Sequence, residues 1–327
     1  MIKVILSTHL WSHLTRGCTV IFLMMAQSTG VYAEGAPTLA EAQSGFISNV
    51  SKIRSGLVTF QIADFRPKDN LLGSVGPSPK NTNVPIITGQ VDVTLAGWGQ
   101  FQWEANQFRN EERRCHLSAD GNQAVAGVVD RLESFDGDVA KNLIRSFSTG
   151  ADPMTTANLE LEEGQLQGSR GMIGCNKPRV GASPVFRSLA YFSPGLLETE
   201  NYFLDSFDPE NLVMEGNRIV VARKGSDLKF VLDPDKSYMP VEVRSGLEGV
   251  DGFFQTISYI NLDGVWFPET ELTQKWDQGK LVYTTTCSLD THEFNKDYPN
   301  DDFGISYPVG TEVEDILLNT QYVVDAN

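Results

Sequence analysis

Residues 253–276 read FFQTISYINLDGVWFPETELTQKW, two runs of alternating residues joined by the Asp-Gly pair at 263–264. Apolar and polar residues that alternate on both sides of Asp-Gly are the strongest short-range signal for a β-hairpin. On the first run, Phe253, Ile257 and Tyr259 share one face because successive residues of a strand point to opposite sides. This stretch therefore predicts two antiparallel strands with one apolar face for burial.

The same alternation extends outward from this hairpin in both directions. A third strand, KLVYTTTCSLDTHEF, follows the turn at 277–279. Earlier in the chain, short strands are predicted at 58–62, 91–95, 101–104, 114–117, 218–223, 228–232 and 241–243. Strands in series without alternating helices favour one antiparallel sheet. We therefore expect a mainly β (α+β) fold, with residues 34–327 forming a single domain.

Few segments have helical periodicity. The clearest helix is predicted over residues 37–53, where Thr38 followed by Glu41 has the pattern of a capping box. Shorter helices are predicted at 139–147, from apolar residues at helical spacing, and from 208 onward, where a proline occupies the first helical position. The helices are thus too few to cover a large sheet on both faces.

Residues 1–33 have the features of a secretory signal peptide. Two basic residues precede a short apolar run, and Ala33 supplies the small residue of a cleavage site. The apolar run, 18–26, is far shorter than the roughly 20 residues that a membrane-spanning helix needs. We expect cleavage between Ala33 and Glu34 and export of the remaining chain to the periplasm or cell envelope.

The charge of the chain excludes one class of partner. The net charge is -16. Residues 1–33 hold two basic residues and no acidic one, so their removal makes the net charge more negative still. An acidic surface repels nucleic acid and anionic lipid headgroups beyond a Debye length of about 8 Å. No nucleic-acid partner is therefore expected.

Three cysteines follow the predicted cleavage site: Cys115, Cys175 and Cys287. Three cysteines in an exported chain can close one disulfide at most. We favour Cys115 with Cys175, since Cys175 lies in a loop bounded by glycine and proline that can reach a strand. The other two pairings, and three buried thiols, remain open.

The sequence lacks the usual catalytic and metal-binding motifs. Only His116 and His292 follow residue 33, and neither has a second histidine at metal-ligand spacing. The run 233–237 begins like a calcium loop, but Tyr238 stands where that loop requires glycine. We therefore predict no catalytic residue, no metal site and no cofactor. A hydrolase using acidic residues stays open, because among 42 acidic residues some pair will lie roughly 5–10 Å apart.

A bent sheet has a concave face, and one N-terminal helix is too small to fill it. Such a sheet must close on itself or hold a cavity. Residues on the more apolar face of their strands are the candidates to line a ligand cavity. They are Phe60, Ile62, Val93, Trp103, Ile257 and Tyr259.

Several short motifs, in order along most of the chain, resemble those of the LolA/LolB-like superfamily of envelope proteins. They are KIRSG at 52–56, LVTFQI at 57–62, YMP at 238–240, GVWFP at 264–268, and the closing segment 303–315 with FGI and PxGTxVxD. The resemblance is to uncharacterised members of the outer-membrane lipoprotein-sorting type. It implies a strongly curved antiparallel sheet, a half-barrel wrapped around the N-terminal helix and one or two short helices.

The resemblance also implies an apolar cavity that accepts acyl chains. The first hypothesis for function is a non-catalytic exported protein that holds a lipid, or the acyl chains of a lipoprotein, in the concave face. The alternative is a periplasmic sensing or structural module whose cavity is plugged by its own helices and whose partner is an envelope protein. These hypotheses differ in one observable, since only the first predicts a displaceable ligand.

Overall fold

The computed structural model describes residues 37–67, 76–77, 86–87, 92–120, 123–147, 166–174, 184–200, 207–299 and 303–326. The predicted signal peptide and its cleavage site between Ala33 and Glu34 lie outside these residues. Within them, no helix has both the length and the apolar character needed to cross a membrane.

One sheet contains all of the described strands. Its strands are β1 Ser55–Arg66, β2 Gly76–Pro77, β3 Ile86–Ile87, β4 Val93–Glu104, β5 Gln107–Asp120, β6 Gln123–Phe135, β7 Ala140–Phe147, β8 Leu166–Ile173, β9 Phe207–Glu215, β10 Arg218–Arg223, β11 Lys229–Asp233, β12 Met239–Leu247, β13 Asp251–Leu262, β14 Val265–Asp277, β15 Lys280–Phe294, β16 Glu312–Asp315 and β17 Thr320–Val323. The helices are α2 Leu39–Val50 and α3 Pro194–Glu200, with 3₁₀ turns η4 Arg187–Phe192 and η5 Pro234–Lys236.

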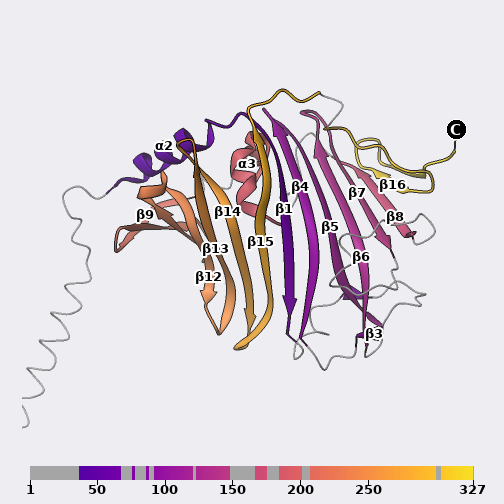
Figure 1. Cartoon of the computed structure of the whole chain (residues 1–327), viewed down its shortest axis with the longest axis horizontal. Coiled ribbons are helices and arrows are strands. Elements are labelled where there is room, and N and C mark those ends of the chain that lie inside the picture. The colour runs from indigo at the N-terminus through magenta and orange to yellow at the C-terminus, as the bar shows by residue number, and fades with distance from the viewer. Residues whose placement is uncertain are drawn as a thin grey trace, which may run out of the picture.

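Neighbouring strands pair in the order β9, β10, β11, β12, β13, β14, β15, β1, β4, β5, β6, β7, β8, β16, β17. All of these pairs are antiparallel except β8 with β16. Figure 1 shows the sheet bent into an open arch, with α3 inside the curve and α2 along one rim. The expected mainly β fold, a strongly curved antiparallel half-barrel around an N-terminal helix and short helices, is confirmed.

The hairpin predicted at residues 253–276 forms between β13 and β14. Asp263 and Gly264 both have positive φ, 52° and 83°, as a two-residue hairpin turn requires. Ile257 and Tyr259 are buried, while the residues between and before them face solvent. The alternation along this strand therefore predicted which of its faces enters the core.

Helix α2 carries the predicted capping box and docks through an unusual contact. The Thr38 hydroxyl accepts from the Glu41 N–H, and the Glu41 carboxylate accepts from the Thr38 N–H. On its buried face, Asn49 Oδ1 accepts from the Trp266 N–H at 2.8 Å, and Asn49 Nδ2 donates to the Trp266 carbonyl at 2.9 Å. One amide side chain thus pairs with the backbone of β14 as a neighbouring strand would.

Two predicted helices are strands in the structure. Residues 139–147 form β7, which pairs with β6 and β8 along its length. The segment from Asp208 forms β9, where Pro209 lies on an edge strand and its missing N–H breaks no ladder bond. Both segments are short, and a short apolar pattern does not separate helix from strand until pairing partners are known.

Candidate functional site

Residues 184–200 lie within the curve of the sheet and are called the plug. They comprise η4 and α3, joined at Ser193. In η4, every residue from Ser188 to Phe192 is buried. The sheet covers this segment on one side, and helix α2 covers it on another, where Phe46 packs edge-on against Tyr191 with ring centroids 5.8 Å apart. The plug therefore occupies the part of the concave face where a ligand cavity was expected.

Aromatic rings fix the plug to the sheet. Phe186 packs edge-on against Phe60 with ring centroids 5.6 Å apart. Phe192 lies 4.7 Å from the Phe267 ring and 6.5 Å from the Trp103 ring. Aromatic rings in edge-on or tilted pairs at these distances attract each other, and this attraction adds to the free energy gained by burying their apolar surface. These contacts join the plug to β1, β4 and β14 at once.

The structure brings together five of the six residues proposed to line a cavity. Phe60, Ile62, Trp103, Ile257 and Tyr259 are all buried and belong to one continuous core. The side chain of Val93 lies outside the described part of the chain. None of the five lines either of the cavities described below. The plug covers two of them, since Phe186 packs on Phe60 and Phe192 packs on Trp103.

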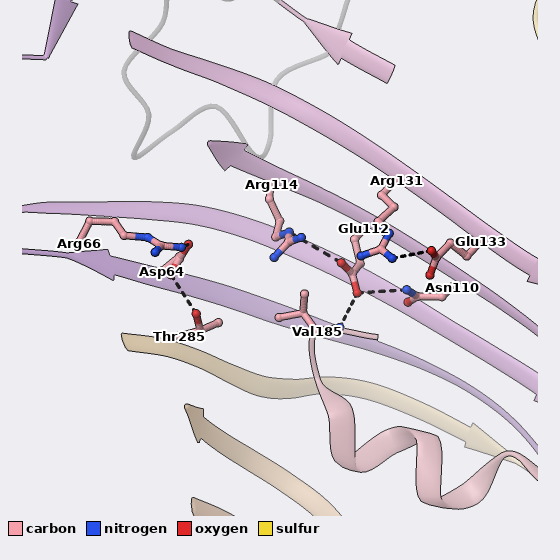
Figure 2. Close-up of polar contacts among 9 residues, drawn as sticks. All are labelled: Asp64, Arg66, Asn110, Glu112, Arg114, Arg131, Glu133, Val185 and Thr285. Carbon is pink, nitrogen blue, oxygen red and sulfur yellow. Dashed lines mark hydrogen bonds and ion pairs between the residues drawn. The ribbon is translucent and has the colours of Figure 1, made fainter. Parts of the chain in front are cut away.

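Two buried carboxylates hold the plug from opposite walls. Glu112 on β5 accepts from the Val185 N–H at 2.6 Å, as Figure 2 shows. Glu271 on β14 accepts from the Arg187 N–H at 3.2 Å, from the Ser188 N–H at 2.9 Å and from the Ser188 hydroxyl at 2.8 Å. The backbone N–H groups at the start of η4 have no partner within the turn. The carboxylates supply those partners.

Burial raises the pKa of Glu271 above its ordinary value, although the hydrogen bonds from Ser188 and Arg187 act to lower it. Burial likewise raises the pKa of Glu133 on β6. A carboxylate removed from water is harder to ionise unless donors surround it. The charge state of Glu271 is therefore coupled to the position of the plug.

The concave surface of β1, β5 and β6 carries paired charges beside the plug, drawn in Figure 2. The Arg66 guanidinium bonds to Asp64 at 2.6 Å, and the Thr285 hydroxyl donates to the same carboxylate at 2.9 Å. Arg131 pairs with Glu133 in the same way. These partly buried charges make this part of the concave face unfavourable for an apolar ligand, since a charge that loses water without gaining a partner is costly. An acyl chain is thus expected elsewhere on the concave face.

A cavity of about 270 Å³ lies between the plug and strands β11, β12 and β13, and is called the β11–β13 cavity. Leu196 and Leu197 line it from the plug, and Leu228, Phe230 and Val243 line it from the sheet. These five side chains make its wall predominantly apolar. Its polar lining residues, Arg187, Ser245 and Gln255, are few. Apolar walls with a small number of placed polar groups are typical of ligand pockets.

A second cavity of about 520 Å³ lies at the other side of the plug, by the end of α2. Val50, Ile53 and Phe192 line it together with charged groups, including Arg54 and Glu104. This second cavity is larger than the β11–β13 cavity, and its wall is more polar. Because Tyr191 and Leu197 line both cavities, the plug is the partition between them.

Two of the three cysteines after the predicted cleavage site lie in described strands. Cys115 is buried in β5, and Cys287 is a buried free thiol in β15. Cys175 lies outside the described residues, so the Cys115–Cys175 disulfide stays a prediction. Among the described residues, no group of three or more His, Cys, Asp or Glu side chains is placed to hold a metal ion.

Sequence reasoning missed the plug, and a signal for it exists. The segment from Pro184 to Leu197 reads PVFRSLAYFSPGLL. A serine followed by proline, Ser193-Pro194, is a typical helix start, and an apolar run bounded by prolines marks a short buried element. By contrast, nothing local distinguishes Glu112 and Glu271 from the other acidic residues of the chain.

Comparison with known proteins gives a likeness in structure only. No family model matches the sequence, and no curated protein matches it. The structure is similar to a LolA superfamily protein from Nitrosomonas europaea, with 10% identity and a TM-score of 0.37 over 83% of this chain and 99% of that one. The chain resembles a LolA-like protein. This is the superfamily that the sequence motifs resemble.

Two other solved structures are similar. A DUF1329 family protein from Desulfovibrio piger has 10% identity and a TM-score of 0.35 over 81% of this chain and 97% of that one. A porin-like protein from Bacteroides uniformis has 7% identity and a TM-score of 0.20 over 72% and 96%. At TM-scores below 0.5 these likenesses carry no conclusion about ligand or activity.

Proposed function

We propose that this chain is an exported, non-catalytic binding protein of the periplasm or cell envelope that holds an acyl chain in the β11–β13 cavity. The observation that carries the proposal is an apolar cavity of about 270 Å³ between a buried plug and the concave face of the sheet. Its ligand is a free lipid or the acyl chain of a lipoprotein.

The energetics of burial support a ligand of this class. Each CH₂ group removed from water contributes about 0.8 kcal/mol. The leucine, phenylalanine and valine side chains of the cavity wall can therefore bind a saturated chain without any hydrogen bond or ion pair to it. The cavity already exists beside the closed plug, so binding there requires no opening of the core.

The first test is mass spectrometry of the native protein purified from an envelope fraction, followed by solvent extraction. We expect a chain that begins at Glu34 and carries a lipid of defined mass. A neutral fluorescent probe, N-phenyl-1-naphthylamine, should bind to the extracted protein. A lipid-free mass together with no probe uptake would overturn the proposal.

A pair of variants locates the site. Leu228 is half-buried at the β11–β13 cavity, so Leu228→Trp fills the cavity and should weaken probe binding at least tenfold. Val213 on β9 is 56% exposed and does not line the cavity, so Val213→Trp adds the same ring without effect. Equal binding by both variants would place the ligand outside the β11–β13 cavity.

The plug also supports a second candidate, an envelope interaction module with a self-plugged concavity. Phe60 and Trp103 are wholly buried under the plug, which is the arrangement that this alternative predicts. This second candidate differs from the lipid-binding protein in two ways. It holds no displaceable ligand, and its partner is an envelope protein. The same extraction and probe experiment separates the two, since only a lipid-binding protein takes up the probe.

A further inference from the structure

One end of the sheet, at β17, has an edge that no other described strand covers. Among the strands of the described part of the chain, β17 pairs with β16 alone, and every residue of β17 is exposed. Figure 1 shows this end of the arch at β16, beside the C-terminal end of the chain. A strand at the end of a sheet presents unpaired backbone N–H and C=O groups that can pair with another chain. A further strand can therefore be added at β17.

The register of the β16–β17 hairpin shows which backbone groups face outward. The Val324 N–H donates to the Thr311 carbonyl at 3.0 Å, and the pairing of β16 with β17 continues in that register. Alternate residues of an antiparallel strand bond to the same neighbour. The N–H and C=O groups of Gln321 and Val323 therefore point away from β16, toward the open edge.

β17 lacks the features by which sheet edges usually avoid pairing with other chains. Proline and charged side chains are two common ones. The strand at the other end of the sheet, β9, has Pro209 and acidic residues at 208, 210 and 215 in its sequence. By contrast, β17 reads TQYV and has neither proline nor a charge. The edge at β17 is thus the less protected of the two.

Apolar side chains are concentrated around this edge. Six of the fourteen large apolar side chains that are exposed in the described part of the chain lie within residues 309–323. They are Val309, Ile316, Leu317, Leu318, Tyr322 and Val323. Scattered apolar residues are normal on a surface, whereas a group of them marks an interaction site.

The charges around the same edge are of one sign. Residues 311–327 include acidic residues at 312, 314, 315 and 325 and no lysine or arginine. Glu312 stands opposite Val323 and Glu314 stands opposite Gln321, so both acids flank one face of β17. Glu312 lies 3.8 Å from Arg170 on β8, but both side chains are at least 71% exposed, and such a pair contributes little.

This charge selects among the partners that could cover the edge. A second copy of the chain would bring the same acids and its own net charge of -16, and an anionic lipid surface would also be repelled. A cationic partner is attracted instead. Charge complementarity therefore favours a basic protein segment at β17.

We propose that β17 accepts an added strand from a cationic partner protein, an extended segment in which basic residues alternate with apolar ones. Its backbone pairs with the outward groups of Gln321 and Val323. Its basic side chains lie on the face that carries Glu312 and Glu314, and its apolar side chains lie on the face of Tyr322. In such complexes backbone hydrogen bonds supply affinity, and side chains at alternate positions supply specificity.

The binding test uses the full chain purified from the envelope and two synthetic peptides of about six residues, the usual length of a strand. One peptide alternates lysine with valine, and the other alternates glutamate with valine. We expect the lysine–valine peptide to bind at least tenfold more tightly, and less tightly at high salt because salt screens exposed charges. Equal binding of the two peptides, or binding of neither, would overturn the inference.

Hydrogen exchange at single amides shows whether the bound peptide pairs as a strand. The N–H groups of Gln321 and Val323 should become protected when the lysine–valine peptide binds, while that of Tyr322, which faces β16, should change little. Unchanged exchange with the peptide bound would mean attraction to the surface without strand addition. Protection of Gln321 and Val323 in the free protein would mean that this chain already covers the edge. Either result contradicts the proposal.

Variants separate the backbone contribution from the charge contribution. Gln321→Pro removes an outward N–H and leaves the bonds to β16 in place, so peptide binding should weaken at least tenfold with an unchanged thermal unfolding midpoint. Glu314→Lys, which keeps the backbone intact, should weaken it similarly. Glu248→Lys makes the same charge change at the exposed turn between β12 and β13 and should have little effect. Equal losses for Glu314→Lys and Glu248→Lys would overturn the inference.

The other two occupants give different results in the same preparation. Binding to phosphatidylcholine vesicles that Leu318→Asp abolishes, without peptide binding, would assign the apolar side chains to a lipid surface. A dimer in analytical ultracentrifugation that Gln321→Pro dissociates would assign the edge to a second copy. Either outcome overturns the cationic partner. Binding of N-phenyl-1-naphthylamine should be the same in every variant, because β17 lies at the opposite end of the strand order from the β11–β13 cavity.

Discussion

At the scale of single residues, Glu271 connects burial, charge and the plug. It is almost fully buried on β14 and accepts three hydrogen bonds from the plug. Burial nevertheless raises its pKa. The folded state therefore holds its proton to a higher pH than the unfolded chain does. The consequence is a pH dependence of stability that one substitution should remove.

Glu271→Gln tests this dependence. An acid whose pKa is raised in the folded state contributes stability that is fully present below its pKa in the unfolded chain, near 4.5. That stability is lost as the pH rises through the raised pKa of the folded state, by about 1.4 kcal/mol for each unit of the shift. The free energy of unfolding of the wild type, relative to Glu271→Gln, should fall as the pH increases from 4.

The measurement is denaturant unfolding of both proteins between pH 4 and 8. Glu269→Gln serves as a control, since Glu269 lies on the same strand and is exposed. If the wild type and Glu271→Gln show parallel profiles over this range, the carboxylate of Glu271 does not titrate differently in the folded state.

Glycine also acts at this scale, by making room for aromatic rings. Gly99 on β4 is paired with Phe60 on β1, and a Cβ atom at Gly99 would overlap the Phe60 ring. Gly99→Ala should therefore destabilise the fold by about 1–3 kcal/mol, as overpacking does. Urea unfolding measures this loss.

Gly168 on β8 is the matched control, because a Cβ atom there meets nothing within 4 Å. Gly168→Ala should leave stability unchanged or raise it slightly. A Gly99→Ala protein as stable as Gly168→Ala would show that the Phe60 ring does not lie over Gly99.

At the scale of elements, α2 takes the place of a strand. The pairing of β14 with β15 begins at Thr270, so the backbone at Trp266 has no partner strand on that side. Asn49 supplies both its donor and its acceptor. The Asn49 side chain thus takes the hydrogen bonds that a neighbouring strand would form with β14 at Trp266, and it anchors helix α2 there.

Asn49→Ala should cost about 2–3 kcal/mol of stability, because it leaves the Trp266 N–H and carbonyl unpaired. Hydrogen exchange at the Trp266 amide should become faster. Ser48→Ala, at an exposed position of the same helix, is the control and should have little effect on either measurement. Unchanged protection of the Trp266 amide in Asn49→Ala would contradict the docking role.

At the scale of the whole molecule, the concave face is divided into three regions. The plug covers its centre, paired charges occupy the surface of β1, β5 and β6, and the apolar β11–β13 cavity lies beside the plug. A ligand in that cavity does not need the central core to open. The ligand and the plug can therefore be present together.

Hydrogen exchange should show this coexistence. On saturation with N-phenyl-1-naphthylamine, the amides of Val185, Arg187 and Ser188 should exchange at an unchanged or slower rate. The exposed turn at 248–250 provides a reference that the probe does not affect. Faster exchange in the plug would mean that the ligand displaces it, and that Phe60 and Trp103 then contact the ligand.

The sequence alone determined the features that depend on neighbouring residues. The hairpin at Asp263-Gly264, the capping box of Thr38 and Glu41, and the buried faces of β1 and β13 all follow from contacts within a few positions. The same patterns predicted an antiparallel sheet, whereas its strong curvature around helices was implied by the resemblance to the LolA/LolB-like superfamily. These patterns placed Phe60, Ile62, Val93, Trp103, Ile257 and Tyr259 each on the more apolar face of its strand, and all of these except Val93, whose side chain lies outside the described part, are buried.

Only the tertiary structure decided what covers that face. Ser188 and Glu271 are 83 residues apart in the chain, and Asn49 and Trp266 are 217 apart. Contacts over such distances leave no periodic signal, and pairing with β6 and β10 overrode the local patterns at β7 and β9. The plug, its two carboxylates and the cavity beside it exist because separate strands converge on one short segment, which no local pattern specifies.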